Sequence, residues 1–206
     1  MSAFHYLFTH LNVLGRYTLE HIVLVGVSLA IAVAIALPLG VIAARQPRLG
    51  AWIVGTAGVF YTIPSLALLA ILVVTIGLGF GTAVIALVIY AQMVLVRSVV
   101  TGLNGVDPGI RDAARGIGYT PWQSLLRVEL PAAMPVLVGG VRVAAVTLIA
   151  LATLGAWIDA GGLGTLLFEG IHTDDPDRII AGALAASLLA IAVDVILRRV
   201  ARATAT

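Results

Sequence analysis

Long runs of uncharged, apolar residues separated by short polar segments dominate this chain of 206 residues. The first run extends from Ile22 to Ala44, and the second, from Leu49 to Val96, contains no charged residue. One membrane crossing takes about 20 residues, so the first run predicts one span and the second is long enough for two. The second run must therefore fold back once, and the glycine-rich stretch Gly77–Gly81 is the expected turn.

Two more apolar stretches follow toward the C-terminus. Residues 132–158 are interrupted only by Arg142, and residues 179–193 form the last stretch. The whole pattern predicts an all-α integral membrane fold of about five transmembrane helices. A guanidinium inside a membrane is costly, so we expect Arg142 to reach the interface or to pair, with a gating role as the alternative. Asp194 and Arg198 are expected to form a structural pair at the end of the last span.

Arginines collect on one side of this five-span topology. They are Arg45, Arg48, Arg97, Arg111, Arg115, Arg127, Arg198, Arg199 and Arg202. Cytoplasmic loops carry the excess of positive charge, so this side is predicted to be the cytoplasm. The opposite side carries only Arg16 and Arg178 as cations, together with an acidic loop. The sequence thus predicts a multi-pass protein of the bacterial cytoplasmic membrane, in contact with lipid, with its N-terminus outside and its C-terminus inside.

The expected organisation is a single transmembrane domain with short ends. Residues 1–20 are too short and polar to span, and we expect them to lie outside, as an interfacial helix. Residues 21–200 form the membrane domain, which includes a cytoplasmic segment at residues 105–131. Residues 201–206 are expected to form a cytoplasmic tail.

Composition excludes several kinds of chemistry. The chain contains 61% hydrophobic and 11% charged residues, no cysteine and no lysine. Disulfides, thiolate metal sites and a phosphate-binding P-loop lysine are therefore absent, so any ATP hydrolysis must occur in a partner chain. The four histidines show no i, i+4 pairing, and no metal site is expected. The arginines flank membrane spans, which explains the net charge of +2 without a nucleic-acid partner.

The cytoplasmic segment begins with one short predicted helix. Asp107 is placed to cap its N-terminus, Pro108 occupies the first position, and Gly118 supplies the left-handed residue that ends it. One face is apolar with small residues at its centre, and it consists of Ile110, Ala113, Ala114 and Ile117. Arg111 and Arg115 lie one turn apart on the polar side, where we expect them to meet acidic groups of a partner.

A second short helix follows in the same segment. Thr120 is the predicted N-cap, Pro121 opens the helix, and Gln123 completes a capping box. The pair Leu130–Pro131 is expected to stop this helix. Two other interpretations are a loop that merely connects two spans, and a helix-turn-helix that reads DNA, which a loop held between two membrane helices disfavours.

The spacing of this segment resembles the EAA loop of bacterial ABC importer permeases. The matching residues are Asp112, Ala113, Ala114, Gly118, Val128, Leu130 and Pro131. Asp112 stands where the family usually has glutamate, and Val128 where it has isoleucine. The resemblance implies that Asp112, Ala113, Ala114 and Gly118 couple the chain to a dimer of ATP-binding subunits. ATP and Mg would be used by that partner, and this chain would hold no cofactor.

Other stretches resemble the permeases that import osmoprotectants such as glycine betaine, choline and carnitine. They are Tyr61–Ala70, Gly105–Pro108, Ala114–Gly118, Thr120–Trp122 and Gly155–Gly164. The resemblance implies the type I (MetI-like) importer fold, an external substrate-binding protein, and a second permease copy that is identical or related. Tyr61 stands where the family has glutamine, and another small solute such as an amino acid is the alternative substrate.

A translocation path is expected near the middle of the second span. Pro64 removes a backbone hydrogen bond, so Thr62 and Ser65 are expected to face the path, with a simple packing kink as the alternative. Tyr61 and Trp157 offer aromatic faces to a quaternary cation, although such residues also serve as interface anchors.

An intramembrane enzyme is the rival from another class. Gly26 and Ser28 resemble a rhomboid-like Gly-x-Ser motif, but no histidine lies deep in a later span to act as a base. We therefore assign no catalytic residue. A passive channel would not need the cytoplasmic segment.

Overall fold

The computed structural model describes residues 9–203. In this range the chain forms helices joined by short turns and loops, with no strand. The helices are α2 (Leu11–Arg45), α3 (Pro47–Thr62), α4 (Ser65–Ile76), α5 (Phe80–Asn104), α6 (Pro108–Gly116), α7 (Pro121–Ser124), the π-helical turn η1 (Leu125–Glu129), α8 (Leu130–Gly155), the 3-10 turn η2 (Ala156–Ile158), α9 (Gly164–His172) and α10 (Pro176–Ala203).

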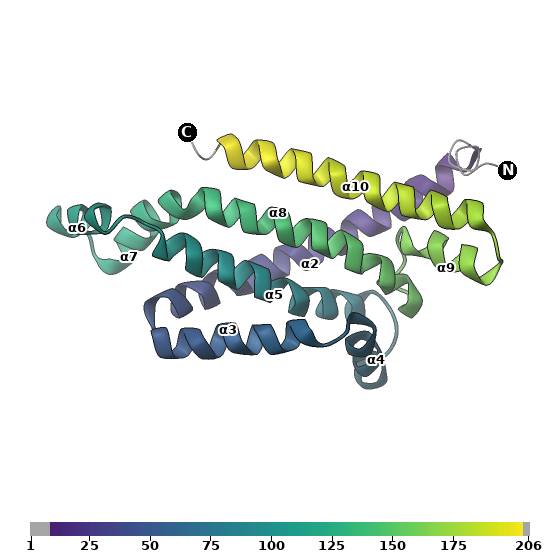
Figure 1. The fold of residues 1–206 in the computed structure, drawn as a ribbon, viewed down its shortest axis with the longest axis horizontal. Helices are drawn as coiled ribbons and strands as arrows, with labels where there is room; N and C mark the ends of the chain where they lie inside the picture. Colours follow the sequence, from purple (N-terminus) through teal and green to yellow (C-terminus); the bar gives the residue numbers. More distant parts are fainter. Residues whose placement is uncertain (1–8, 204–206) are drawn as a thin grey trace.

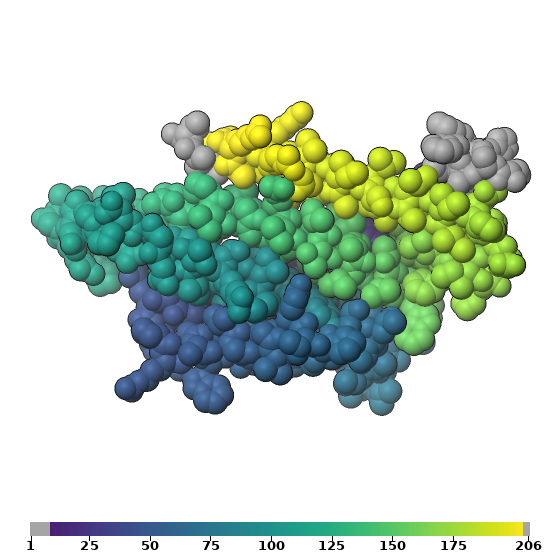
Figure 2. All heavy atoms as spheres, in the orientation of Figure 1, coloured from purple at the N-terminus to yellow at the C-terminus, as the bar shows by residue number. Residues whose placement is uncertain are grey.

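Three long helices, α2, α5 and α8, form the centre of an elongated bundle (Figure 1). Helix α3 lies along one edge of the bundle and α10 along the other. Small residues with no exposed surface, such as Ala32, Ala144 and Ala152, line the contacts and pack with larger ones such as Leu148. Small side chains let helix backbones approach closely, which is how helices associate in a membrane. Helices α6 and α7 project at the end opposite α9, beyond the start of α3 (Figure 2).

Membrane spans can be assigned by length and hydropathy. Within the described residues, α2, α5, α8 with its preceding turns, and α10 are each long and apolar enough to cross a membrane. The bent pair α3–α4 completes the count of five if it is taken as one broken span. The all-α multi-span prediction is therefore confirmed, and Gly77 and Gly79, both with positive φ, form the expected turn before α5.

Helix α2 is longer than the sequence indicated. Its 35 residues run without a break from Leu11, so residues 11–20 continue the first span and do not form a separate interfacial helix. At 1.5 Å per residue it is about 50 Å long, more than the roughly 30 Å hydrocarbon layer. Tyr17 packs this extension against the bundle, because its hydroxyl donates to Glu169 Oε1 at 3.3 Å. Residues 1–8 lie outside the described range.

The C-terminal end also differs from the sequence prediction. Residues 201–203, expected in a separate tail, continue α10 to Ala203, and residues 204–206 lie outside the described range.

The second span is broken where the sequence suggested a kink. Helices α3 and α4 meet at 95°, with Ile63 and Pro64 between them in extended conformations. Proline lacks an N–H and disfavours helical geometry in the residue before it, which explains the break. The Tyr90 hydroxyl on α5 donates to the Ile63 carbonyl, so the exposed peptide group at the break has a partner.

Arg142, the one charge within the apolar stretch of residues 132–158, is half-buried and paired as expected. Its Nε donates to Asp194 Oδ1 on α10, and Asp194 Oδ2 also accepts from Arg198 Nη2 at 2.7 Å. The carboxylate therefore lies between two guanidiniums and joins α8 to α10.

Candidate functional site: the cytoplasmic helix pair and the membrane break

Helix α6 is built by the local signals that the sequence contains. The Asp107 carboxylate accepts a hydrogen bond from the Gly109 N–H at 2.7 Å, and Pro108 is the first helical residue. The helix ends at Gly116, and Gly118 has φ +85°, a left-handed conformation that glycine adopts without steric cost. The capped helix predicted from the sequence is thus confirmed.

Helix α7 has the expected capping box but does not stop at Pro131. The Gln123 N–H donates to Thr120 Oγ1 at 3.3 Å, and the Thr120 N–H donates to the Gln123 side chain at 2.9 Å. The helix then widens into η1, where the Leu130 N–H reaches back five residues to the Leu125 carbonyl, and it continues as α8. Pro131 has no N–H and cannot donate a helical hydrogen bond. The wider π-type turn accommodates this missing bond, so the helix continues past the proline without a break.

The helix pair leaves much of its apolar surface uncovered. Ala114 is the one buried residue of α6, whereas Ile117 is 72% exposed and Ile110 is also exposed. Ala113 is exposed as well, and Trp122 on α7 is 65% exposed. Exposed apolar side chains on a helix pair that projects from the bundle (Figure 2) are typical of a protein–protein contact.

The two arginines of α6 have different surroundings. Arg115 and Asp112 form an ion pair of 3.3 Å in which each side chain is 72% exposed, so both are open to a partner. Arg111 is turned inward with 25% of its side chain exposed: Nη2 donates to the Leu103 carbonyl, and Nε lies 3.4 Å from Glu129 Oε2. Within its own chain Arg111 thus already meets an acidic group, Glu129, whereas its expected contact with a partner's acidic groups stays a prediction.

Sequence reasoning missed Glu129, the most enclosed charged residue of the segment. It is 2% exposed, and its Oε1 accepts from Arg45 Nη2 at 2.7 Å and from the Ser124 hydroxyl at 3.1 Å. A carboxylate next to Leu130–Pro131, at the start of an apolar helix, was the available signal, since a buried charge requires partners.

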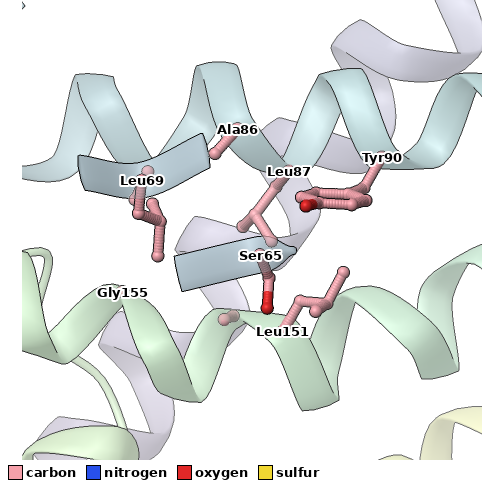
Figure 3. Close-up of a pocket in the computed structure, with 9 residues that line it drawn as sticks. Ser65, Leu69, Ala86, Leu87, Tyr90, Leu151 and Gly155 are labelled. Atoms are coloured by element: carbon pink, nitrogen blue, oxygen red, sulfur yellow. The ribbon is translucent and has the colours of Figure 1, made fainter. Parts of the chain in front are cut away.

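The residues expected in the translocation path gather at the α3–α4 break. Tyr61 is 43% exposed and its ring lies edge-on to Tyr90, with 6.1 Å between the ring centres. The Thr62 hydroxyl donates to the Val59 carbonyl of its own helix at 2.7 Å, and Pro64 is exposed. Ser65 instead points from α4 toward α8 (Figure 3). The structure therefore brings these four residues together at one place.

A small cavity lies beside the break, between α4, α5 and α8. Ser65 and Tyr90 line it with apolar residues that include Leu151 and Gly155 (Figure 3). Its volume is about 10 Å³, roughly the space of one water molecule and far less than a trimethylammonium group needs. In this conformation the cavity is closed to such a ligand.

Trp157 lies away from this cavity, in the turn η2 at the end of the bundle opposite α6, where it is exposed (Figure 1). The loop after it is fastened to α2. The Gly162 N–H donates to Glu20 Oε2 at 3.1 Å, and the Leu163 N–H donates to His21 Nδ1 at 3.3 Å. His21 Nε2 lies 3.0 Å from the Ile149 carbonyl, so this buried imidazole has partners on both nitrogens and holds the loop in place.

The fold is a helix bundle with a broken second span and a projecting, capped helix pair. This combination defines a class of protein, the membrane permease of an importer whose energy comes from a subunit outside the membrane domain. Residues 36–206 match the family described as "Binding-protein-dependent transport system inner membrane component". The chain belongs to this family. It is therefore a multi-pass permease subunit of the inner membrane, which works with ATP-binding and substrate-binding partners.

Curated relatives match over nearly the full length. The osmoprotectant import permease protein OsmW of Salmonella typhimurium is 40% identical over 97% of this chain and 95% of the relative. The carnitine transport permease protein OpuCB of Listeria monocytogenes is 37% identical over 86% of this chain and 81% of the relative. A solved chain of the MetNI methionine ABC transporter, inward facing, has a TM-score of 0.84 at 25% identity, covering 93% of this chain and 95% of the solved one.

Gly118 offers a sharp test of the helix pair. A Cβ there meets no atom within 4 Å, so a substitution acts through the positive φ alone, at a cost of roughly 1–2 kcal/mol for an ordinary residue. Asparagine tolerates this conformation better than valine. We expect Gly118→Asn to keep much more transport than Gly118→Val in reconstituted vesicles, with both variants inserted to wild-type amounts. Equal transport by the two variants would contradict the structural role of this residue.

Proposed function

We propose that this chain is the permease subunit of an ATP-binding-cassette importer for quaternary ammonium osmoprotectants, such as glycine betaine, choline or carnitine, in a bacterial cytoplasmic membrane. The observation that carries the proposal is the near full-length similarity to permeases named for osmoprotectant, carnitine and choline transport. The exposed helix pair supports the ATP-driven part of the proposal, since an unpartnered apolar tip on a membrane protein needs a cytoplasmic partner to cover it.

Coupling to ATP hydrolysis is assigned to α6. Asp112, Ala113, Ala114 and Gly118 lie on or just after this helix, where they would contact a dimer of ATP-binding subunits that uses ATP and Mg. The small side chains of Ala113 and Ala114 allow a partner backbone to come close, and the exposed Asp112–Arg115 pair offers both signs of charge. This chain itself needs no cofactor for such a role.

A second permease copy, identical or related, would complete the translocation path. Tyr61, Thr62 and Pro64 are exposed at the edge of the bundle formed by α3 and α4, so a path lined by them runs between this chain and another. Tyr61 and Trp157 would offer π faces to a quaternary cation, which has no hydrogen-bond donor and is attracted to such faces. The external binding protein would dock near the fastened loop at Gly162.

The orientation follows from the ends of the helices. Arg45 ends α2, Arg48 begins α3, and Arg198 to Arg202 close α10, all at the end that bears α6. The opposite end carries Asp159, Glu169 and the acids before α10. The positive-inside rule then supports a cytoplasmic C-terminus and an external N-terminus.

The substrate is tested with the reconstituted complex. We expect ATP hydrolysis to rise several-fold when the cognate binding protein is added with glycine betaine, choline or carnitine, because substrate-loaded binding protein drives closure of the ATP-binding subunits. Methionine is the matched comparison, given the fold shared with the MetNI chain. Stimulation by methionine alone would overturn the substrate class while leaving the importer mechanism in place.

Orientation is tested by single cysteines, since the native chain has none. In intact right-side-out vesicles, a membrane-impermeant maleimide should label Asp174→Cys and leave Gly116→Cys unlabelled until the membrane is opened. Both positions are exposed in the subunit. Labelling of Gly116→Cys once the membrane is opened shows that its earlier protection reflects its side of the membrane and not cover by a partner subunit. The reverse labelling pattern would refute the proposed topology.

The path is tested at Tyr61. Tyr61→Ala removes the π face, and an attraction of about 0.5–1 kcal/mol corresponds to a loss of uptake rate at low substrate of roughly 2- to 5-fold. Tyr61→Phe keeps the face and serves as the control, with uptake close to wild type. If the alanine variant transports as well as the phenylalanine variant, Tyr61 does not contact the substrate.

A further inference from the structure

We propose that Glu129 is the positioning residue through which movement of the coupling helix α6 reaches the membrane helices. The proposal rests on the coupling role assigned to α6 above. Nothing in the resemblance to importer permeases assigns a role to this glutamate. It stands between Val128 and Leu130, two positions of the matched motif, and is itself outside it.

One carboxylate joins three separate elements. Oε1 is 2.7 Å from Arg45 Nη2, at the last residue of α2, and Oε2 is 3.4 Å from Arg111 Nε, on α6. Glu129 itself ends the π-type turn that leads into α8, and Ser124 of α7 donates to Oε1 at 3.1 Å. A displacement of α6 therefore pulls on α2 and α8 through the same group.

Burial shapes this connection, which on the α6 side is an ion pair without a hydrogen bond, because Arg111 Nε and Glu129 Oε2 are both buried and have no hydrogen-bond partner. Glu129 is 2% exposed, whereas the side chains of Arg45 and Arg111 are 40% and 25% exposed. The carboxylate is hidden from water and the two guanidiniums reach it from the outside, so solvent screens the attraction less than at a surface pair. Loss of the negative charge would leave two guanidiniums facing each other across a neutral group.

Helix α6 has few other attachments to the bundle. Ala114 is its one buried residue, and its apolar side chains Ile110 and Ile117 are exposed. Arg111 adds a hydrogen bond to the Leu103 carbonyl near the end of α5. The inward-facing contacts of α6 thus pass mainly through Ala114 and Arg111, and Arg111 depends on Glu129 for its charge partner.

The structure contains a matched control. Asp194 also lies between two guanidiniums, those of Arg142 and Arg198, but it joins α8 to α10 and does not touch α6. Replacing either carboxylate by its amide removes one negative charge from a three-group cluster in the same subunit. Only the cluster on α6 should affect the coupling of ATP hydrolysis to transport.

The experiment measures substrate transported per ATP hydrolysed in proteoliposomes of the full complex with its binding protein. We expect Glu129→Gln to lower this ratio at least 3-fold, because ATP hydrolysis continues while movement of α6 no longer reaches the bundle. Asp194→Asn should keep the wild-type ratio. A Glu129→Gln variant with an unchanged ratio would overturn the proposal, whatever its stability, because a purely structural role lowers both activities together.

Arg111→Gln provides a second variant if Glu129→Gln assembles poorly. It should lower the ratio as well, and adding it to Glu129→Gln should cause little further loss, because the two changes remove one interaction. Additive losses would mean that the two residues act separately and would overturn the proposal.

A distance measurement separates this proposal from the choice of substrate. Because the chain lacks cysteine, spin labels at Gln46→Cys and Gly116→Cys report directly on the separation of α2 and α6 in the assembled complex. We expect one narrow distance distribution that Glu129→Gln broadens and Asp194→Asn does not. If the distance distribution stays narrow in Glu129→Gln, the proposed positioning role of Glu129 is overturned even if transport is established. Failure of every substrate in the wild type would instead refute the proposed function and leave the distance result standing.

Discussion

A bilayer interior supplies no water to hydrogen-bond peptide groups, and this constraint accounts for how the chain treats its prolines. At Pro64 the helix opens by 95°, and the Ile63 carbonyl left at the break accepts from the Tyr90 hydroxyl. At Pro131 the helix widens, and Leu130 donates to the Leu125 carbonyl, so α8 continues. Of these two prolines, Pro64 breaks a helix at the expected path, whereas Pro131 lies within a helix that continues from α7 into α8.

The same scarcity of water shapes the charged residues. Glu129 and Asp194 each lie between two arginines, and each joins helices that are far apart in the sequence. All the basic residues are arginine, whose planar guanidinium presents several donors in a fixed fork and so holds a shared carboxylate in one geometry. The two clusters hold α8 at its start and at its middle, since Glu129 precedes Leu130 and meets α2 and α6, whereas Arg142 lies halfway along the helix and meets α10.

Features encoded within a few residues could be predicted from the sequence. The caps of Asp107 and Thr120, and the turn near Gly77, depend on near neighbours and were found. Features set by distant residues were missed. The inward turn of Arg111 depends on Glu129, which also binds Arg45, 84 positions earlier in the chain, and the sharp break at Pro64 is held by Tyr90, 27 positions from Ile63. Periodicity and capping rules contain no information about such partners.

The coupling of α6 to the membrane helices and the selectivity for substrate depend on different parts of the assembly. The contacts that join α6 to α2 and α8 lie within one chain, so the structure of a single subunit defines them. The cavity beside the break holds about 10 Å³, too little for a quaternary amine, and Tyr61 is exposed on the edge where we propose a second copy. In the proposed assembly, selectivity within the membrane would arise from residues of two subunits in a more open state. A chain of the MetNI methionine transporter shares the fold at 25% identity, whereas the relative named for osmoprotectant import is 40% identical.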